Sequence, residues 1–360
     1  MNIKVYEKYI MKNNLNIILQ VSLIFFTLIF ILNIFEEINF FKDLDQSILY
    51  PFILTLLNSP SVLYDIFPFI FLIATQFFFI KINDKNELII FKNYGINNFK
   101  ILRLLVYITV IIALFINTIF YFVSSNLKYS YLDLKNEYSK DNKYLAVITE
   151  NGLWIKDEYN KITNIINSEK IVGDELIDVE ITQFNDQFQL DRIIFAEKIN
   201  IKENNWIIKN PKISKNNFNY VSDEEIILKT NFNSKKLNSL FGNLNSLTFF
   251  ELLDMKKNYK KLGYSTVEVE VHIQKFYTYP FYLTIMTLLS AIIMFNIRQD
   301  KPIIFHLILG IFLSVLIYYI NFFSNVLGES LELSSVVSVI MPLLIITLSC
   351  SVGLVKLNEK

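Results

Sequence analysis

The sequence predicts an α-helical membrane protein with six spanning helices, three before and three after an inserted, jelly-roll-like β-rich domain. Of its 360 residues, 53% are hydrophobic, and the mean hydropathy is +0.38. A soluble protein of this length rarely carries so much apolar material, so the bilayer is the first hypothesis. Residues 124–275 differ from the rest, because they contain no apolar run long enough to cross a membrane.

The first apolar run follows a basic segment. Residues 1–14 carry lysines at helical spacing, which indicates an amphipathic helix at the inner membrane surface. Residues 15–35 are uncharged, and about 20 apolar residues suffice to cross the hydrocarbon core. A signal peptide is the competing interpretation. It fails because the run is too long and ends in an acidic pair without a small-residue cleavage site.

Five further apolar runs complete the membrane part. The predicted spans are 62–80, 101–123, 276–296, 302–323 and 336–355. Between the first two spans, Pro51 and Pro60 are expected to break residues 36–61 into a connecting segment. Pro68 falls inside a span, where a membrane helix tolerates proline if a neighbour satisfies the freed carbonyl.

Residues 124–275 alternate between short β patterns and turns. The predicted strands are 144–149, 153–156, 161–166, 176–184, 192–201, 206–209 and 225–229. Asn151-Gly152 is a strong hairpin signal, and regularly spaced strands favour a sandwich or a jelly-roll-like sheet. Helical spacing returns over 247–262 and ends at Gly263. The predicted division is therefore 1–123, 124–275 and 276–360.

Lysine and arginine gather in alternate connecting segments. The basic segments are 1–14, 81–103, 298–301 and the C-terminal tail, whereas 36–61 and 324–335 are acidic. Basic loops stay in the cytoplasm, and this rule gives one consistent orientation. Both termini are predicted inside and the β-rich block outside.

The stretch 81–103 between the second and third spans is the strongest local signal. Asp84 is expected to cap a helix with Glu87 closing a capping box, and Gly95 to end it in a left-handed turn that brings Ile96 against Phe91. Asn97 or Asn98 can cap the next helix. The pattern predicts a short helix over 84–95, a fixed bend and a new helix. Such a helix can receive a push from a soluble partner. The alternative interpretation is that the stretch is an interfacial loop that only connects the two spans.

Recognisable catalytic chemistry is missing from the sequence. It contains no phosphate-cradling loop, so no ATP hydrolysis is expected of this chain, and neither histidine has metal-ligand spacing. We therefore expect a non-catalytic protein without a cofactor or metal of its own. The net charge of zero gives no reason to expect nucleic acid as a partner. Asp65, near the outer end of its span, is expected to face water.

The phenylalanine-rich walls of the spans admit two interpretations. Phe26 and Phe30 either fill lipid-facing surface or line a cavity for an acyl chain. A lateral opening would admit an amphiphile, because lipid chains are as apolar as these walls.

The order of these parts resembles the LptF/LptG family of lipopolysaccharide export permeases, and looks closer to LptG. The matching residues are Asn86-Glu87-Leu88, Tyr94-Gly95-Ile96, Gly152-Leu153-Trp154-Ile155-Lys156-Asp157, Glu251-Leu252, Gly263 and Pro280. The resemblance covers essentially the whole chain.

The resemblance implies a subunit of an ATP-driven transporter in the bacterial inner membrane. An LptF-like chain would complete a heterodimer, although pairing with a second copy of this chain stays open. An LptB-like ATPase dimer would use ATP at the cytoplasmic face. Lipopolysaccharide would pass through the periplasmic β-domain to LptC-like and LptA-like partners, LptC being a single-span protein. Glu87 would contact the ATPase, Leu88 and Phe91 would belong to the coupling helix, and Gly95 would set the bend.

One departure from the family concerns the outer end of the first span. The resemblance leads us to expect a basic residue there, facing lipid phosphates, but this sequence has Asn33, and Lys42 is the nearest cation. The expected substrate path therefore comprises Phe26, Phe30, Asn33 and Lys42. The alternative function is a mechanotransmitting or scaffold membrane protein that binds an outside partner without moving lipid.

Overall fold

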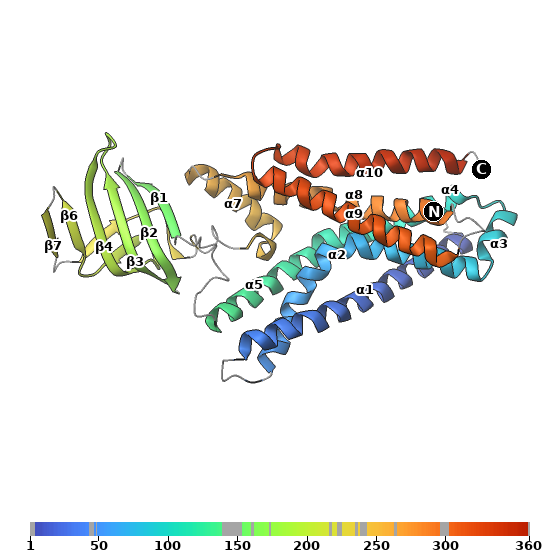
Figure 1. Cartoon of the computed structure of the whole chain (residues 1–360), viewed down its shortest axis with the longest axis horizontal. Helices are drawn as coiled ribbons and strands as arrows, with labels where there is room; N and C mark the ends of the chain where they lie inside the picture. The colour runs from blue at the N-terminus through green and yellow to red at the C-terminus, as the bar shows by residue number, and fades with distance from the viewer. Residues whose placement is uncertain are drawn as a thin grey trace. The chain divides into compact units, whose positions relative to one another are not determined.

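The structure is a computed structural model that describes most of the chain. The described residues are 4–42, 47, 49–138, 153–159, 162–172, 174–215, 218–221, 225–234, 237, 243–262, 265–295 and 302–358. The chain divides into a helical unit, Met1–Lys128 with Val267–Lys360, and a second unit, Tyr129–Thr266, that contains a β-sheet (Figure 1).

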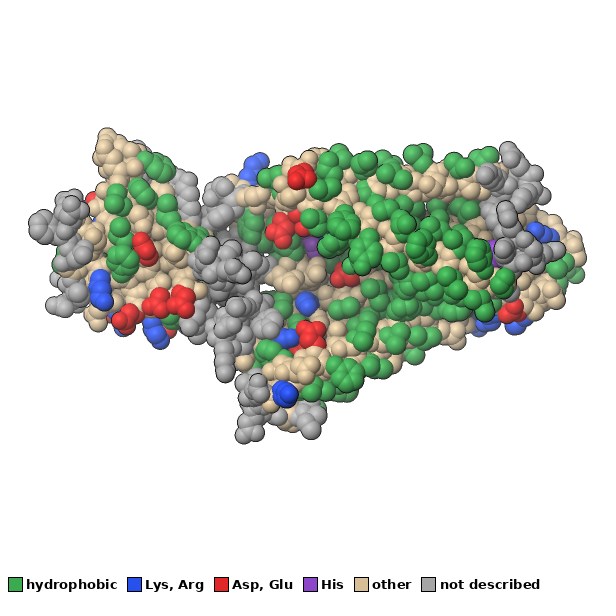
Figure 2. Space-filling model, in the orientation of Figure 1, with side chains coloured by type: hydrophobic (Ala, Val, Ile, Leu, Met, Phe, Trp, Pro, Cys, Tyr) green, Lys and Arg blue, Asp and Glu red, His purple; other side chains and the backbone are tan. Residues whose placement is uncertain are grey.

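The helical unit contains long apolar helices, the short helix α3 and the π-helical turn η1. Its elements are α1 (Val5–Phe41), α2 (Leu49–Asp84), α3 (Glu87–Asn93), α4 (Asn98–Phe115), η1 (Ile116–Phe120), the first part of α5 (Tyr121–Tyr138), α8 (Val267–Phe295), α9 (Ile303–Glu329) and α10 (Ser335–Asn358). Among the described residues, six stretches are long and apolar enough to cross a membrane, with α4, η1 and α5 forming one of them. This confirms the six predicted spans. Figure 2 shows hydrophobic side chains covering a broad belt of this unit.

The first connection differs from the sequence prediction. The helix α1 runs without a break from Val5 to Phe41, and α2 begins at Leu49, so most of residues 36–61 is helical. Pro51 lies in the first turn of α2, where backbone N–H groups need no intrahelical acceptor. Pro60 lies inside α2, and a bundled membrane helix continues through proline when its surroundings satisfy the backbone. The predicted break at these prolines was therefore wrong.

Pro68 leaves the Tyr64 carbonyl, four residues earlier in α2, without its helical donor. The Tyr279 hydroxyl of α8 donates a hydrogen bond to that carbonyl. The two tyrosine rings also stack, with centroids 4.3 Å apart. The predicted condition for a proline in this span is thus met by a neighbouring span.

Pro280 in α8 frees the Phe276 carbonyl in the same way. The Asn117 side-chain amide donates to it across 3.1 Å, and the Asn117 carbonyl oxygen accepts from the Tyr64 hydroxyl at 2.9 Å. Asn117 lies in η1, a single π-helical turn of the kind that often re-aims a side chain. This one amide therefore joins three spans.

Pro342 in α10 likewise frees the carbonyl of Ser338. The Ser324 hydroxyl of α9 donates to it across 2.6 Å. Gly328, one turn later in α9, allows the approach, since a Cβ there would lie 2.2 Å from the Ser338 hydroxyl.

The inserted unit is built on a branched antiparallel sheet. Its strands are β1 (Leu153–Tyr159), β2 (Ile162–Val172), β3 (Glu175–Phe184), β4 (Leu190–Asn200), β5 (Asn205–Ile208), β6 (Lys212–Lys215), β7 (Phe218–Val221) and β8 (Ile226–Lys229). The strand order is β1-β2-β3-β4-β5-β8, and β6 pairs with β4 and β7. One end of β4 pairs with β5 and the other with β6, so the sheet forks there.

One face of the sheet buries an apolar core. Trp206 is fully buried, and its indole N–H donates to the Phe232 carbonyl across 3.0 Å. The helix α7 (Phe249–Leu262) forms where a helix was predicted, and its Glu251 carboxylate accepts hydrogen bonds from the Thr248 N–H and hydroxyl. The inserted β-domain is thereby confirmed. The predicted strand 144–149 and hairpin turn lie outside the described residues.

We predict that Tyr279→Phe lowers the free energy of unfolding of the detergent-solubilised protein by about 1–3 kcal/mol, because it leaves the Tyr64 carbonyl buried without a donor. In a Pro68→Ala background the same change should cost less, because the restored N–H at position 68 takes over that carbonyl. Tyr107→Phe, at an exposed tyrosine of α4, is the matched control. An equal loss from Tyr279→Phe in both backgrounds would contradict the assignment.

Candidate functional site

The segment that links the second and third spans contains the short helix α3. The helix α2 ends at Asp84, Asn86 adopts a left-handed conformation with φ of 56°, and α3 begins at Glu87. Asp84 therefore does not cap α3, and the capping box predicted with Glu87 is absent. The sequence reasoning failed because α2 extends one turn further than expected and takes up the capping residue. The helix is also shorter than the predicted 84–95 segment.

The C-terminal end of α3 forms as predicted. Gly95 has φ of +74°, the Ile96 N–H donates to the Phe91 carbonyl at 2.9 Å, and the Gly95 N–H donates to the Lys92 carbonyl at 3.0 Å. These two bonds define a Schellman motif, which turns the chain sharply. Ile96 is buried in the apolar cluster of the helical unit, and Phe91 packs against that cluster.

A second capping motif starts α4 directly after the bend. The Asn97 side chain accepts from the Lys100 N–H at 3.0 Å, as the sequence suggested. The Lys100 ammonium group donates to the Gly95 carbonyl at 2.9 Å. Hydrogen bonds thus hold both sides of the turn, and the angle between α3 and α4 is fixed locally.

Apolar side chains of α3 divide between an inner and an outer face. Leu88 and Phe91 are half-buried and pack against the apolar cluster, whereas Ile89 and Ile90 are 58% and 49% exposed. Tyr94, at the end of the helix, is 82% exposed. Exposed apolar residues that gather on one short element suit a docking surface better than a connecting loop.

Glu87 begins α3 and is bonded within the chain. Its Oε1 accepts from the Tyr9 hydroxyl of α1 at 2.7 Å and lies 4.0 Å from the Lys85 ammonium group. Its Oε2 is buried without a hydrogen-bond partner. The sequence offered no sign of the contact with Tyr9, since the two residues are 78 positions apart.

The residues predicted for a substrate path all lie on or just after α1. Phe26 packs against the bundle core, and the Phe30 ring meets the Phe52 ring of α2 edge-on at 5.1 Å. Asn33 is half-buried, and its side-chain N–H₂ group has no hydrogen-bond partner. Lys42 is exposed at the end of α1. The structure thus sets the aromatic pair against other helices, buries the Asn33 amide nitrogen and leaves the Lys42 side chain exposed.

A close contact between α2 and α9 was also missed from the sequence. The buried Gln76 side chain donates to the His306 carbonyl at 3.0 Å. Gly310 makes room for it, because a Cβ at that position would lie 2.0 Å from the Gln76 amide nitrogen. His306 itself is buried, so the structure places it in a helix contact.

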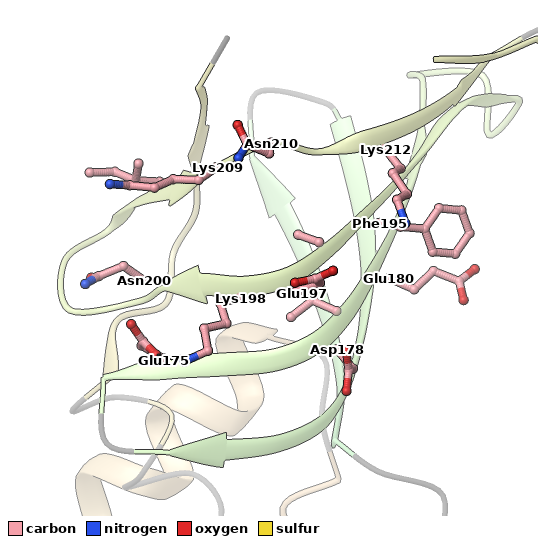
Figure 3. A pocket seen from close by; sticks show the side chains of 13 residues that line it. Glu175, Asp178, Glu180, Phe195, Glu197, Lys198, Asn200, Lys209, Asn210 and Lys212 are labelled. Carbon is pink, nitrogen blue, oxygen red and sulfur yellow. Dashed lines mark hydrogen bonds and ion pairs between the residues drawn. The ribbon is translucent and has the colours of Figure 1, made fainter. Parts of the chain in front are cut away.

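The β-sheet unit carries an open cavity of about 1000 Å³ over β3, β4 and the start of β6 (Figure 3). Its lining mixes carboxylates and lysines with apolar side chains such as Phe195 and Ile207, and Lys198 pairs with Glu175 at 3.4 Å. No group of three or more His, Cys, Asp or Glu residues in the described part of the chain is arranged to hold a metal ion. We assign no chemistry to this cavity.

Six apolar spans, an inserted antiparallel sheet and a rigidly bent helix between the second and third spans define a multi-pass permease-like membrane protein. The model of one family, described as "Lipopolysaccharide export system permease LptF/LptG", matches residues 8–356. The chain therefore belongs to the LptF/LptG family, and it is a multi-pass protein of the inner membrane.

A curated relative was also found. The chain is 28% identical over 164 residues to the uncharacterized protein RP871 of Rickettsia prowazekii (strain Madrid E). The match covers 45% of this chain and 42% of the relative, so less than half of that protein is spanned.

We predict that Gly95→Ala destabilises α3 by about 1–2 kcal/mol, because an L-residue with a side chain resists the left-handed conformation. Nothing lies within 4 Å of the added Cβ, so the cost is conformational and not steric. Gly95→Asn should cost less, since asparagine tolerates this conformation. Hydrogen exchange of the α3 amides measures both, and equal protection in the alanine variant and the parent protein would refute the argument.

Proposed function

We propose that this chain is the non-catalytic membrane subunit through which a separate cytoplasmic ATPase drives lipopolysaccharide out of the inner membrane. The observation that carries the proposal is α3, a two-turn helix with an exposed apolar face between two hydrogen-bonded bends. A rigid element of this kind transmits a push to the spans on either side of it. A flexible loop would absorb the push.

The proposed partners follow from the family. An LptB-like ATPase dimer binds the cytoplasmic face, and an LptF-like permease completes the membrane heterodimer. An LptC-like single-span protein and an LptA-like bridge receive the lipid from the β-sheet unit, which we place in the periplasm. ATP is hydrolysed by the partner, and this chain carries no cofactor.

The orientation rests on charge. The α3 segment lies in a lysine-rich stretch, Lys81 to Lys100, as do the residues that precede the first span. Basic connecting segments remain on the cytoplasmic side. We therefore place α3 and both termini in the cytoplasm, where an ATPase can reach them.

The substrate path is proposed along α1. Phe26 and Phe30 pack against neighbouring helices along this path, and the exposed Lys42 offers a donor to a polar headgroup. Asn33 lies on the same helix, with its amide nitrogen buried. An ammonium group attracts phosphate oxygens and donates charge-assisted hydrogen bonds to them. The single lysine is a weaker site than a cluster of cations, so further cations from a partner subunit would complete it.

We predict that Glu87→Ala reduces ATP-driven release of lipopolysaccharide from proteoliposomes that contain the whole complex by roughly tenfold, equivalent to about 1.4 kcal/mol. Membrane insertion should be unaffected, because the residue lies on a connecting helix. Glu36→Ala, at an exposed glutamate of α1, is the matched control.

Unchanged release and unchanged ATPase binding in Glu87→Ala would refute the assignment of α3 to coupling. A parent complex that binds its partners but releases no lipid with ATP would instead support the alternative, a scaffold that moves no lipid.

A further inference from the structure

The second, third and fourth spans each depart from a regular α-helix near one another. Pro68 interrupts the hydrogen-bond ladder of α2, and Pro280 interrupts that of α8. The third span contains the π-helical turn η1 between α4 and α5. Prolines and π-turns are the usual places at which a long helix kinks. Each of these spans therefore has a preferred place to bend.

Hydrogen bonds between side chains and backbone set the three irregular places at one depth. The Asn117 amide of η1 donates to the Phe276 carbonyl of α8 at 3.1 Å and accepts from the Tyr64 hydroxyl of α2 at 2.9 Å. Tyr279 of α8 closes the circuit by donating to the Tyr64 carbonyl. Both carbonyls lie one turn before the proline of their own helix, so the three bends are neighbours in space.

These bends divide the three spans into two sets of segments. The inner segments, which α3 joins directly, are 69–84, 98–115 and 281–295, and the outer segments are 49–63, 121–128 and 267–275. Two of the outer segments are continuous with the chain of the β-sheet unit. Any displacement that passes from α3 along these spans must therefore cross the level of the bends.

The inner segments are bonded to one another. The Thr109 and Thr287 hydroxyls are 3.3 Å apart and join α4 to α8. The Ser290 hydroxyl of α8 donates to the Leu72 carbonyl of α2 at 2.8 Å. All four residues are fully buried, so water does not compete for these bonds. The inner segments should move as one body.

The outer segments are bonded in the same way. The Lys128 ammonium group of α5 donates to the Asn58 side-chain oxygen of α2 at 2.6 Å. The Tyr121 hydroxyl of α5 lies 3.4 Å from His272 Nε2 of α8. Two bonded bodies thus meet at a level where all three helices have a place to bend. A change of angle costs least there, because elsewhere it would distort an intact helical ladder.

We propose that the second, third and fourth spans form a hinge at this level, and that Asn117 is its positioning residue. The inner segments turn against the outer segments as one body, while the Asn117 amide keeps the π-turn in register with both prolines. This inference rests on the proposed function, because it states how a push on α3 crosses the membrane unit as a change of angle.

The first test removes the bends in the whole reconstituted complex. Pro68→Ala and Pro280→Ala each return a backbone donor to their helix, so the Tm should be unchanged or higher. The number of lipopolysaccharide molecules released per ATP hydrolysed should nevertheless fall roughly threefold to tenfold. Pro342→Ala, at a proline inside α10 and outside the hinge, is the matched control and should leave this ratio unchanged. A parent-like ratio in both hinge variants would overturn the proposal.

A second test separates positioning by Asn117 from mere stabilisation. Asn117→Ala should lower both the Tm and the release ratio, because it removes the donor to Phe276 and the acceptor for Tyr64. Adding Pro280→Ala gives the Phe276 carbonyl a helical donor again, so much of the Tm should return while the ratio stays low. If the ratio recovers together with the Tm, Asn117 has no positioning role.

A third measurement needs no transport. Nitroxide labels are attached to cysteines in a Cys350→Ser background, and their distances are measured by pulsed EPR in nanodiscs. The pair Phe77→Cys with Val123→Cys spans the hinge, and the pair Phe77→Cys with Tyr107→Cys lies within the inner segments; all three native side chains are exposed. The first pair should give the broader distance distribution, and Pro68→Ala with Pro280→Ala should narrow it to the width of the second.

The two proposals can fail separately. Absence of ATP-driven release from the parent complex would count against the proposed function alone. Equal widths for the two label pairs in the parent protein would overturn the hinge, whatever the transport result.

Discussion

Within a bilayer every backbone carbonyl needs a hydrogen-bond donor from the protein, and this constraint organises the helical unit. Pro68, Pro280 and Pro342 each remove a helical donor, and in each case a side chain from another span replaces it. The prolines therefore do more than bend their helices. They create the acceptors at which neighbouring spans are joined in a defined register.

These joints give the spans directional contacts that lipid-like side chains cannot supply, since lipid tails solvate leucine as well as another helix does. Asn117 shows the principle most fully, because one amide contacts α2 and α8 from a π-helical turn. Under the proposed function, a push on α3 enters α2 directly. From α2 the displacement reaches α8 through the hydrogen bond of Tyr279 to the Tyr64 carbonyl, and it reaches α9 through the hydrogen bond of Gln76 to the His306 carbonyl.

The sequence predicted what short-range chemistry decides. The six spans follow from hydropathy, and the turn at Gly95 follows from the need for a left-handed residue. Longer-range features were out of reach. Pro60 was interpreted as a helix break because the local sequence does not reveal the neighbouring helices that let α2 continue through it. The strands β6 and β7 were missed because each has only four residues and little apolar pattern. The Tyr9–Glu87 bond joins positions that no local pattern connects.

The account requires α3 and the β-sheet unit to lie on opposite sides of the inner membrane. The direct measurement labels single cysteines in intact spheroplasts with a membrane-impermeant thiol reagent. The native Cys350 is 2% exposed and should stay silent. We expect Lys198→Cys, on β4, to react in intact spheroplasts, and Lys92→Cys, on α3, to react only after permeabilisation. The reverse pattern, or labelling of both from one side, would contradict the account.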